Sequence, residues 1–408
     1  MKKSLFIMFI SFSFVLSACS TENSTKKGNE LLEKLHLSEE TTVENTTQNQ
    51  VRGVSQNLNN LDLYSKLDKA VTRYEEYYDF SGAVYVGMDD EEIFSKTSGM
   101  ANYDQDVPNT LDTKFLIGSL TKQFTAAAIL ILEEKGLLEL DHQVTDYIPE
   151  ATQWEEITIH HLLSMSSGIV NTDHPHFIRN IDEFLESSEN NNMSNISPLL
   201  TPEESIAIYK DIPLNFKPGE RYEYSNSNYL VLGLIIELTS GDPYETFLEE
   251  NIFEPLGMLN SGYSIDWDNQ QNKAIGWYKK NNSENKFYPV QAEYFHYHSA
   301  GGLYSTINDL KTWNRALYSE ELLKKETIDK MYSPYTKTSI IEYGYGWFTK
   351  GDSVEHSGSV PGFISHIYRE LDTELVIIIL SNNESLVGGI LDTLTNNLEE
   401  LLKANGDD

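Results

Sequence analysis

Cysteine and positive charge are both scarce in this chain of 408 residues. Its single cysteine is Cys19, so no intramolecular disulfide can form and the fold must be stable without one. The 30 lysines and arginines stand against 63 aspartates and glutamates, which gives a formal net charge of −33. Such acidity disfavours nucleic acid as an electrostatic partner. We therefore expect no nucleic-acid partner.

The apolar run near the N-terminus, residues 5–16, is too short to span a bilayer. It follows two lysines, and a basic start before a short apolar run is typical of a signal peptide, which we place at residues 1–18. The sequence Leu-Ser-Ala-Cys that follows resembles a bacterial lipobox. We therefore predict a lipoprotein held on the outer face of the bacterial cell membrane by a lipid on Cys19. The alternative is that Cys19 is incidental and the protein is secreted free.

Large apolar residues are few in residues 19–60, which are rich in Asn, Thr, Glu, Gln and Ser. This composition cannot bury a core and predicts a flexible tether, attached to the membrane through its lipid. Residues 61–402 are numerous enough to bury one large core, and we assign them to one domain. Residues 403–408 form a short tail.

Ser119 and Lys122 lie three residues apart at the start of an apolar, helix-like run. Positions i and i+3 share one face of a helix, so the Lys122 amine can reach the Ser119 hydroxyl. A buried lysine with a lowered pKa could then remove the serine proton and make it a nucleophile. The alternative for this short pattern is an ordinary helix cap followed by a solvated lysine.

Two later segments supply partners for this pair. A Pro-Gly turn precedes Tyr224 and Asn226, which introduce another apolar, helix-like run. Farther on, the small residues around His356 and Gly358 suit a strand that approaches a substrate closely. Taken singly, each residue has a plainer alternative: a core tyrosine, a turn asparagine or a surface histidine.

Ser-x-x-Lys, Tyr-x-Asn and His-x-Gly, in this order, resemble the three motifs of the penicillin-recognising serine hydrolases. The Tyr-x-Asn form points to the branch that contains class C β-lactamases, D-alanyl-D-alanine carboxypeptidases, D-aminopeptidases and serine esterases. The resemblance covers residues 62–402. It implies an α/β fold of the β-lactamase-like (serine transpeptidase-like) kind, in which helices flank an antiparallel sheet beside a mainly helical lobe.

The ends of this domain carry strand-like patterns that suit such a sheet. Residues 81–87 and 93–98 predict a hairpin, and residues 364–369 and 376–380 predict two more strands before a closing helix at 386–402. We expect these strands to share one antiparallel sheet, with the helical lobe between about residues 137 and 300.

The resemblance also implies a role for each motif residue. Ser119 would attack a carbonyl and become acylated, while Lys122 takes or shares its proton. Tyr224 would lie opposite as a base or a proton relay, and which of the two is the base stays open. Asn226 would orient Lys122 and the substrate.

The last motif would complete the site from a strand. His356 would place a donor near Tyr224 and the substrate's carboxylate or leaving group. The backbone N–H groups of Ser119 and Ser359 would form an oxyanion hole, and Gly358 would let the strand close on the substrate.

Class C β-lactamases carry a lysine where this chain has His356, which is only partly charged at neutral pH. We therefore predict an exported serine hydrolase, a D-amino-acid peptidase (D-Ala-D-Ala carboxypeptidase-like) or esterase acting on cell-wall-related substrates such as peptidoglycan-derived peptides. A class C-like β-lactamase is the first alternative, with β-lactams as inhibitors or substrates. A non-catalytic penicillin-binding or sensing lipoprotein is the second.

No cofactor and no metal is expected. His174 and His176, and likewise His296 and His298, form close pairs without a recognised ligand spacing. Residues 171–202 predict a long loop that could border the site.

Overall fold

The computed structural model describes residues 48–171, 206–207, 210–279, 287–289, 298–383 and 389–406. The expected signal peptide, Cys19 and the loop after Asn171 therefore lie outside the described residues. Within the described ranges, no helix combines the length and the apolar character that crossing a bilayer requires. The chain divides into two units, 1–59 and 60–408, and the second contains the fold described below.

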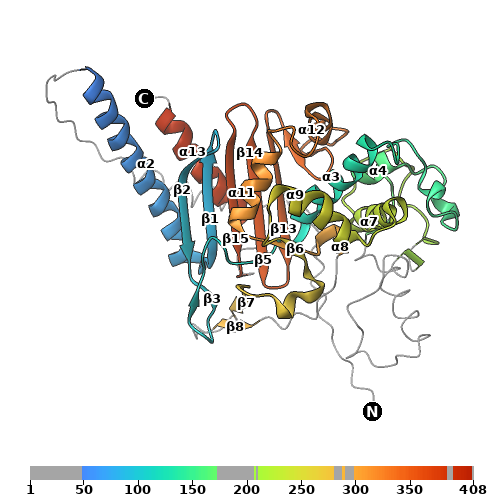
Figure 1. The fold of residues 1–408 in the computed structure, drawn as a ribbon, viewed down its shortest axis with the longest axis horizontal. Helices are drawn as coiled ribbons and strands as arrows, with labels where there is room; N and C mark the ends of the chain where they lie inside the picture. Colours follow the sequence, from blue (N-terminus) through green and yellow to red (C-terminus); the bar gives the residue numbers. More distant parts are fainter. Residues whose placement is uncertain are drawn as a thin grey trace, which may run out of the picture. The chain divides into compact units, whose positions relative to one another are not determined.

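Eight antiparallel strands form the central sheet, in the order β10-β11-β12-β13-β14-β15-β1-β2 (Figure 1). Their bounds are β1 Gly82–Met88, β2 Glu91–Ser98, β10 Thr336–Lys337, β11 Glu342–Tyr343, β12 Phe348–Lys350, β13 Ser353–Val360, β14 Phe363–Glu370 and β15 Leu375–Ser381. Strand β1 pairs with β15, and Gly82 lies opposite Ser381. The two ends of the domain thus share one antiparallel sheet, as the strand patterns predict.

Strand β15 explains why the sheet is covered on both faces. It reads Leu-Val-Ile-Ile-Ile-Leu-Ser and is buried along its whole length. Because successive side chains of a strand point to opposite faces, Ile377 and Ile379 enter one hydrophobic cluster while Ile378 and Leu380 enter another. Each cluster requires its own layer of helices.

One face of the sheet is covered by α13 (Ile390–Gly406) and by residues 63–74 of α2 (Gln48–Tyr78), where Leu67 and Leu398 belong to the same buried cluster (Figure 1). Helix α2 begins at Gln48, inside the segment 19–60 for which the composition predicts a flexible tether. The helix then continues without interruption through residues 61–78 of the domain.

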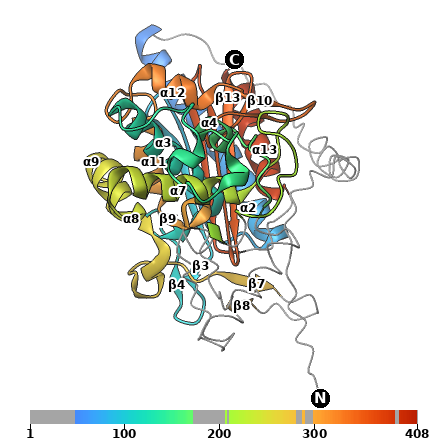
Figure 2. The ribbon, with the colours of Figure 1, turned by 90° about the vertical axis from the view of Figure 1, so that its right-hand side faces the viewer.

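The opposite face is covered by α3 (Thr121–Glu134), α11 (Ile307–Ala316) and the helical lobe, which faces the viewer in Figure 2. The described helices of the lobe are η3 Val144–Asp146, η4 Thr152–Trp154, α4 Ile159–Leu163, α7 Asn226–Ser240, α8 Tyr244–Leu248, η6 Glu249–Phe253, α9 Glu254–Leu256, η7 Ser264–Asn269 and α10 His298–Gly301. Helix α12 spans Lys325–Tyr332.

Three small sheets complete the described part of the domain. Their strands are β3 Met100–Asn102 with β4 Val107–Pro108, β5 Phe115–Leu116 with β9 Leu303–Ser305 and β6 Gly262–Tyr263, and β7 Trp277–Lys279 with β8 Phe287–Pro289. Strand β5 leads directly into the turn that carries Ser119. Its pairing with β9 therefore fixes that turn on one side.

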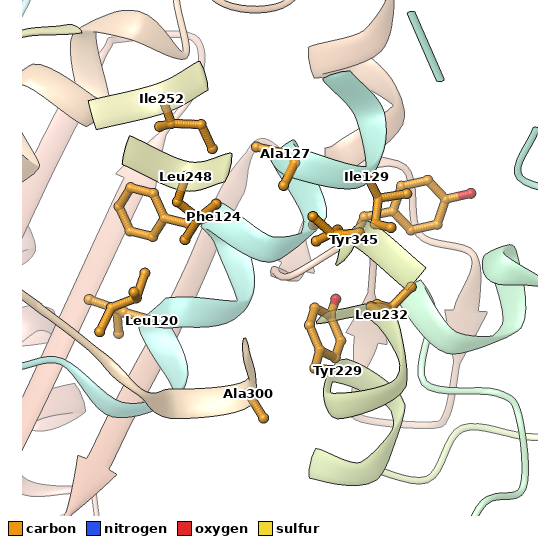
Figure 3. Close-up of a cluster of buried hydrophobic side chains, with 14 of the residues drawn as sticks. Leu120, Phe124, Ala127, Ile129, Tyr229, Leu232, Leu248, Ile252, Ala300 and Tyr345 are labelled. Carbon is orange, nitrogen blue, oxygen red and sulfur yellow. The ribbon is translucent and has the colours of Figure 1, made fainter. Parts of the chain in front are cut away.

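Helix α3 is the centre of the larger cluster, and every residue from Thr121 to Leu132 is buried. In Figure 3, Phe124 lies beside Leu248 on one side of α3, whereas Tyr229 and Leu232 of α7 lie on the other. Such packing all round the helix leaves Lys122 no route to solvent.

Candidate active site

Ser119 lies in a single turn of 3-10 helix, η2 (Gly118–Leu120), directly before α3. The sequence predicts it at the start of the helix, and the structure adds this turn, in which Ser119 is half-buried. Gly118 has a φ of +52°, which favours glycine. A Cβ there would also stand 2.6 Å from the backbone nitrogen of Ser359. The turn and strand β13 therefore touch at the nucleophile.

Lys122 is 0% exposed, and its amine contacts three oxygens from three parts of the chain. Its Nζ lies 3.0 Å from Ser119 Oγ, 2.8 Å from Asn226 Oδ1 and 2.6 Å from the carbonyl oxygen of Ala300. Burial lowers the pKa of Lys122 well below its usual value, because the charged form loses its hydration. As a neutral amine, Lys122 can donate to Asn226 and Ala300 and accept the proton of Ser119.

Tyr224 lies on the other side of the nucleophile and donates a 2.9 Å hydrogen bond to Ser119 Oγ. Burial raises the pKa of Tyr224, and the bond to Ser119 opposes this shift only in part. The phenol therefore keeps its proton at neutral pH. With Lys122 biased toward the neutral amine and Tyr224 toward the protonated phenol, the site has a base on one side of Ser119 and a proton donor on the other.

Asn226 begins α7 and links the base to the rest of the lobe. Its Oδ1 accepts a hydrogen bond from Lys122, as described above, while its backbone N–H donates to Asn171 Oδ1 over 2.8 Å. The turn before it is held by a bond from the Glu223 N–H to the Met165 carbonyl, 3.0 Å long. Asn226 thus orients Lys122 from a fixed position.

His356 lies on β13 with only 2% of its surface exposed. Its Nδ1 donates to the carbonyl of Ser357 over 2.7 Å, so Nε2 is the acceptor, and the Tyr343 hydroxyl lies 3.4 Å from it. Burial is the main cause that lowers the pKa of His356 to about 3. The sequence predicts a partly charged donor beside Tyr224. The structure corrects this, because His356 is neutral and its N–H is already bonded.

Gly358 and Ser359 follow on the same strand. A Cβ on Gly358 would stand 1.9 Å from the carbonyl oxygen of Ile117. Glycine is therefore required so that β13 can approach the Ser119 turn. The half-buried Ser359 brings its backbone nitrogen beside this turn, and Ser119 and Ser359 are thus placed to offer N–H groups to one oxyanion.

Comparison with known proteins places this arrangement in a family. Residues 67–396 match the family described as Beta-lactamase. The chain belongs to the beta-lactamase family. Penicillin-binding protein 4* of Bacillus subtilis is 29% identical over 327 residues, which cover 76% of this chain and 69% of that protein. The geometry around Ser119 and this family membership make the protein a serine hydrolase.

Solved structures of the beta-lactamase fold agree with this assignment. The octameric penicillin-binding protein homologue from Pyrococcus abyssi is 30% identical, with a TM-score of 0.68, and covers 79% of this chain and 74% of its own. The D-amino acid amidase from Ochrobactrum anthropi, solved with D-phenylalanine, shares the fold at 22% identity and a TM-score of 0.69, over 85% of this chain and 99% of its own.

Histidines outside the active site of this beta-lactamase family member have structural roles. His161 Nδ1 accepts the N–H of Thr158 at the start of α4, 3.2 Å away. Within the described ranges, one set of possible metal ligands comes together, Glu237, Glu245 and His298, whose ligand atoms lie within 4.8 Å of one another. Glu237 already accepts the N–H of Tyr244 at the start of α8, over 2.9 Å. His174, His176 and His296 lie outside the described residues.

Three residues at this site of the beta-lactamase family member lie outside the three sequence motifs. Ala300 supplies a carbonyl oxygen, which has no signature in the side-chain sequence. Asn171 belongs to none of the three motifs, and nothing in the sequence distinguishes it from the other asparagines of this chain. Phe348 lies beside Tyr224, with ring centroids 6.4 Å apart. In the sequence, the only signal for Phe348 is its position shortly before the strand predicted around His356.

Proposed function

We propose that the protein hydrolyses esters or amides through an acyl-enzyme on Ser119, with Lys122 as the base and Tyr224 as the proton donor. The observation that carries this proposal is the position of Ser119 Oγ between Lys122 Nζ at 3.0 Å and the Tyr224 hydroxyl at 2.9 Å. Both pKa shifts, downward for Lys122 and upward for Tyr224, favour this assignment of base and acid.

The chemical steps balance with these groups alone. Ser119 Oγ forms a bond to the acyl carbon, and its proton passes to Lys122. The bond to the leaving group then breaks, and Tyr224 gives its proton to the leaving oxygen or nitrogen and regains one from Lys122. Water attacks the acyl-enzyme in a second cycle of the same kind and releases the acid.

The proposed substrates are D-amino-acid peptides, amides or esters related to the cell wall. A D-amino acid amidase among the structural neighbours supports a D-amino acyl group. The neutral His356 favours substrates without a carboxylate on the leaving group over a D-Ala-D-Ala carboxypeptidase reaction. We further propose export and a lipid anchor on Cys19, which rest on the signal-like N-terminus alone.

The test uses chromogenic esters and D-amino acid amides with the full chain and its Ser119→Ala variant. We expect the wild type to release a burst of leaving group and to gain the mass of the acyl group on Ser119. Ser119→Ala should lose both, because the attacking hydroxyl between the base and the acid is removed. Hydrolysis that is unchanged in Ser119→Ala would overturn the proposed function.

A further inference from the structure

The side of the site on which the leaving group departs can be assigned from exposure. A leaving group must collect a proton as it departs, and the donor must be within its reach. Lys122 is fully buried and bonded to protein oxygens, whereas Tyr224 is only half-buried. The leaving group therefore departs past Tyr224, and the side chains around this phenol determine which leaving groups fit.

Three rings meet at this point. Phe348 lies nearly parallel to Tyr224, with 7° between the ring planes and 6.4 Å between the centroids. The ring centroid of His356 lies 5.1 Å from that of Phe348 and 6.3 Å from that of Tyr224. The plane of the His356 ring is inclined by 43° to Phe348 and by 46° to Tyr224. Phe348 and Tyr224 are both half-buried, and the Tyr224 hydroxyl reaches Ser119 Oγ.

This group of rings is uncharged at neutral pH. Tyr224 remains a phenol and His356 a neutral imidazole, for the reasons given above. The Nε2 of His356 is occupied by the Tyr343 hydroxyl at 3.4 Å, and Tyr343 itself packs edge-on against Phe348, 4.9 Å between centroids. A carboxylate bound here would lose its hydration without gaining an ion pair with a cation, which is unfavourable. A flat apolar ring would instead pack against the aromatic side chains.

We propose that Phe348, together with Tyr224 and His356, forms the subsite for an uncharged leaving group that carries a flat apolar ring. This inference deepens the proposed function and rests on it. Phe348 is the specificity-determining residue, because it contributes aromatic surface and no group to the chemical step. The class of substrate that follows is an acyl compound esterified to, or in amide linkage with, a neutral aromatic group.

The experiment measures kcat/KM of the full chain for phenyl acetate, 3-carboxyphenyl acetate and trifluoroethyl acetate. In Phe348→Ala, the ratio of phenyl to trifluoroethyl ester should fall about tenfold, the value of one aromatic contact. Phe348→Leu keeps an apolar side chain of similar size and should lower the ratio in the same direction, even if the alanine variant folds poorly. Lys350→Ala, an exposed change on the same strand, should leave the ratio as in the wild type.

The wild type should also disfavour 3-carboxyphenyl acetate relative to phenyl acetate, after correction for their hydroxide-catalysed rates. An unchanged phenyl preference in both folded Phe348 variants would overturn the subsite. The failure of the proposed function has a different signature, since it would leave ester hydrolysis intact in Ser119→Ala. Loss of hydrolysis in Ser119→Ala with no effect at Phe348 would overturn the subsite alone.

Discussion

Gly358 lies against the carbonyl group of Ile117, and a Cβ on Gly358 would be 1.9 Å from the Ile117 oxygen. This contact brings strand β13 to the turn that carries Ser119. The two N–H groups that we assign to the oxyanion, those of Ser119 and Ser359, belong to these two segments. Their spacing is therefore fixed by the absence of a side chain at position 358.

Gly358→Ala should push β13 away from the Ser119 turn. Because one N–H group would then miss the developing oxyanion, kcat/KM for an ester should fall about 10²- to 10³-fold. The strain of overpacking should also lower the free energy of unfolding by about 1–3 kcal/mol. Steady-state kinetics and urea unfolding measure the two effects.

Gly351→Ala is the control for this change. Gly351 has a φ of +59°, and no atom lies within 4 Å of the place that a Cβ would take, so alanine there strains the backbone without a clash. Its kcat/KM should equal that of the wild type. A fully active Gly358→Ala enzyme would contradict the assignment of Ser359 to the oxyanion hole.

Lys122→Met should lower kcat/KM by about 10²- to 10⁴-fold, since the base is removed. Lys122→Arg should not restore activity, because a guanidinium does not give up its proton near neutral pH. In the wild type, kcat/KM should rise with pH until Lys122 is neutral, and burial places this rise well below the ordinary lysine range. A pH profile of kcat/KM checks the direction.

The matched control is Lys135→Met, at an exposed position just beyond the end of α3. It should keep the wild-type pH profile. If Lys122→Arg were as active as the wild type, Lys122 would act only as a fixed charge, and Tyr224 would have to be the base.

His356 predicts a loss of stability in acid. Its pKa is about 3 in the folded protein and about 6.5 in the unfolded chain. Between these values the unfolded state binds the extra proton, so stability is complete above pH 6.5 and decreases as the pH falls toward 3. From pH 7 to pH 4 this single group should lower the free energy of unfolding by about 3 kcal/mol.

His356→Gln removes the titrating group and should flatten this part of the pH dependence, measured by urea unfolding at each pH. His142→Gln is the control for a histidine-to-glutamine change elsewhere, at a side chain that is 42% exposed. Identical slopes for the wild type and His356→Gln would show that His356 does not titrate in the unfolding reaction.

Cys19→Ala tests the proposed anchor. We expect the wild type in the membrane fraction, with the mass of a diacylglycerol on its N-terminal cysteine. The variant should leave that fraction, because no thiol remains to accept the lipid. Ser20→Ala changes the next residue and should stay anchored. A Cys19→Ala protein that remains in the membrane with an unaltered N-terminal mass would contradict the lipoprotein proposal.

The sequence predicts which side chains meet at the site, but only part of how they act. Ser119, Lys122, Tyr224 and Asn226 carry recognisable spacing, and the structure places their polar atoms in one hydrogen-bonded group. The Ala300 carbonyl could not be predicted, since a backbone oxygen is common to every residue. The tautomer of His356 depends on a bond to its own strand, and that bond has no pattern in the sequence.

The fold is also predictable in part, because its strands have recognisable patterns of apolar residues. Strands such as β15 are rich in isoleucine, and the period of two sets their faces. Composition is less decisive for the start of α2, because polar residues without proline are compatible with both a helix and a tether.

The pairing of β1 with β15 has a consequence for the order of events in folding. The first strand of the domain is far from this partner along the chain, and the hairpin it forms with β2 keeps one edge unpaired until β15 is in place. Strand β13, which carries Ser359, can settle into the sheet only when β14 and β15 are also in place. Before its C-terminal strands have paired, the chain therefore holds its nucleophile without a complete site, and activity should begin only once these strands have joined the sheet.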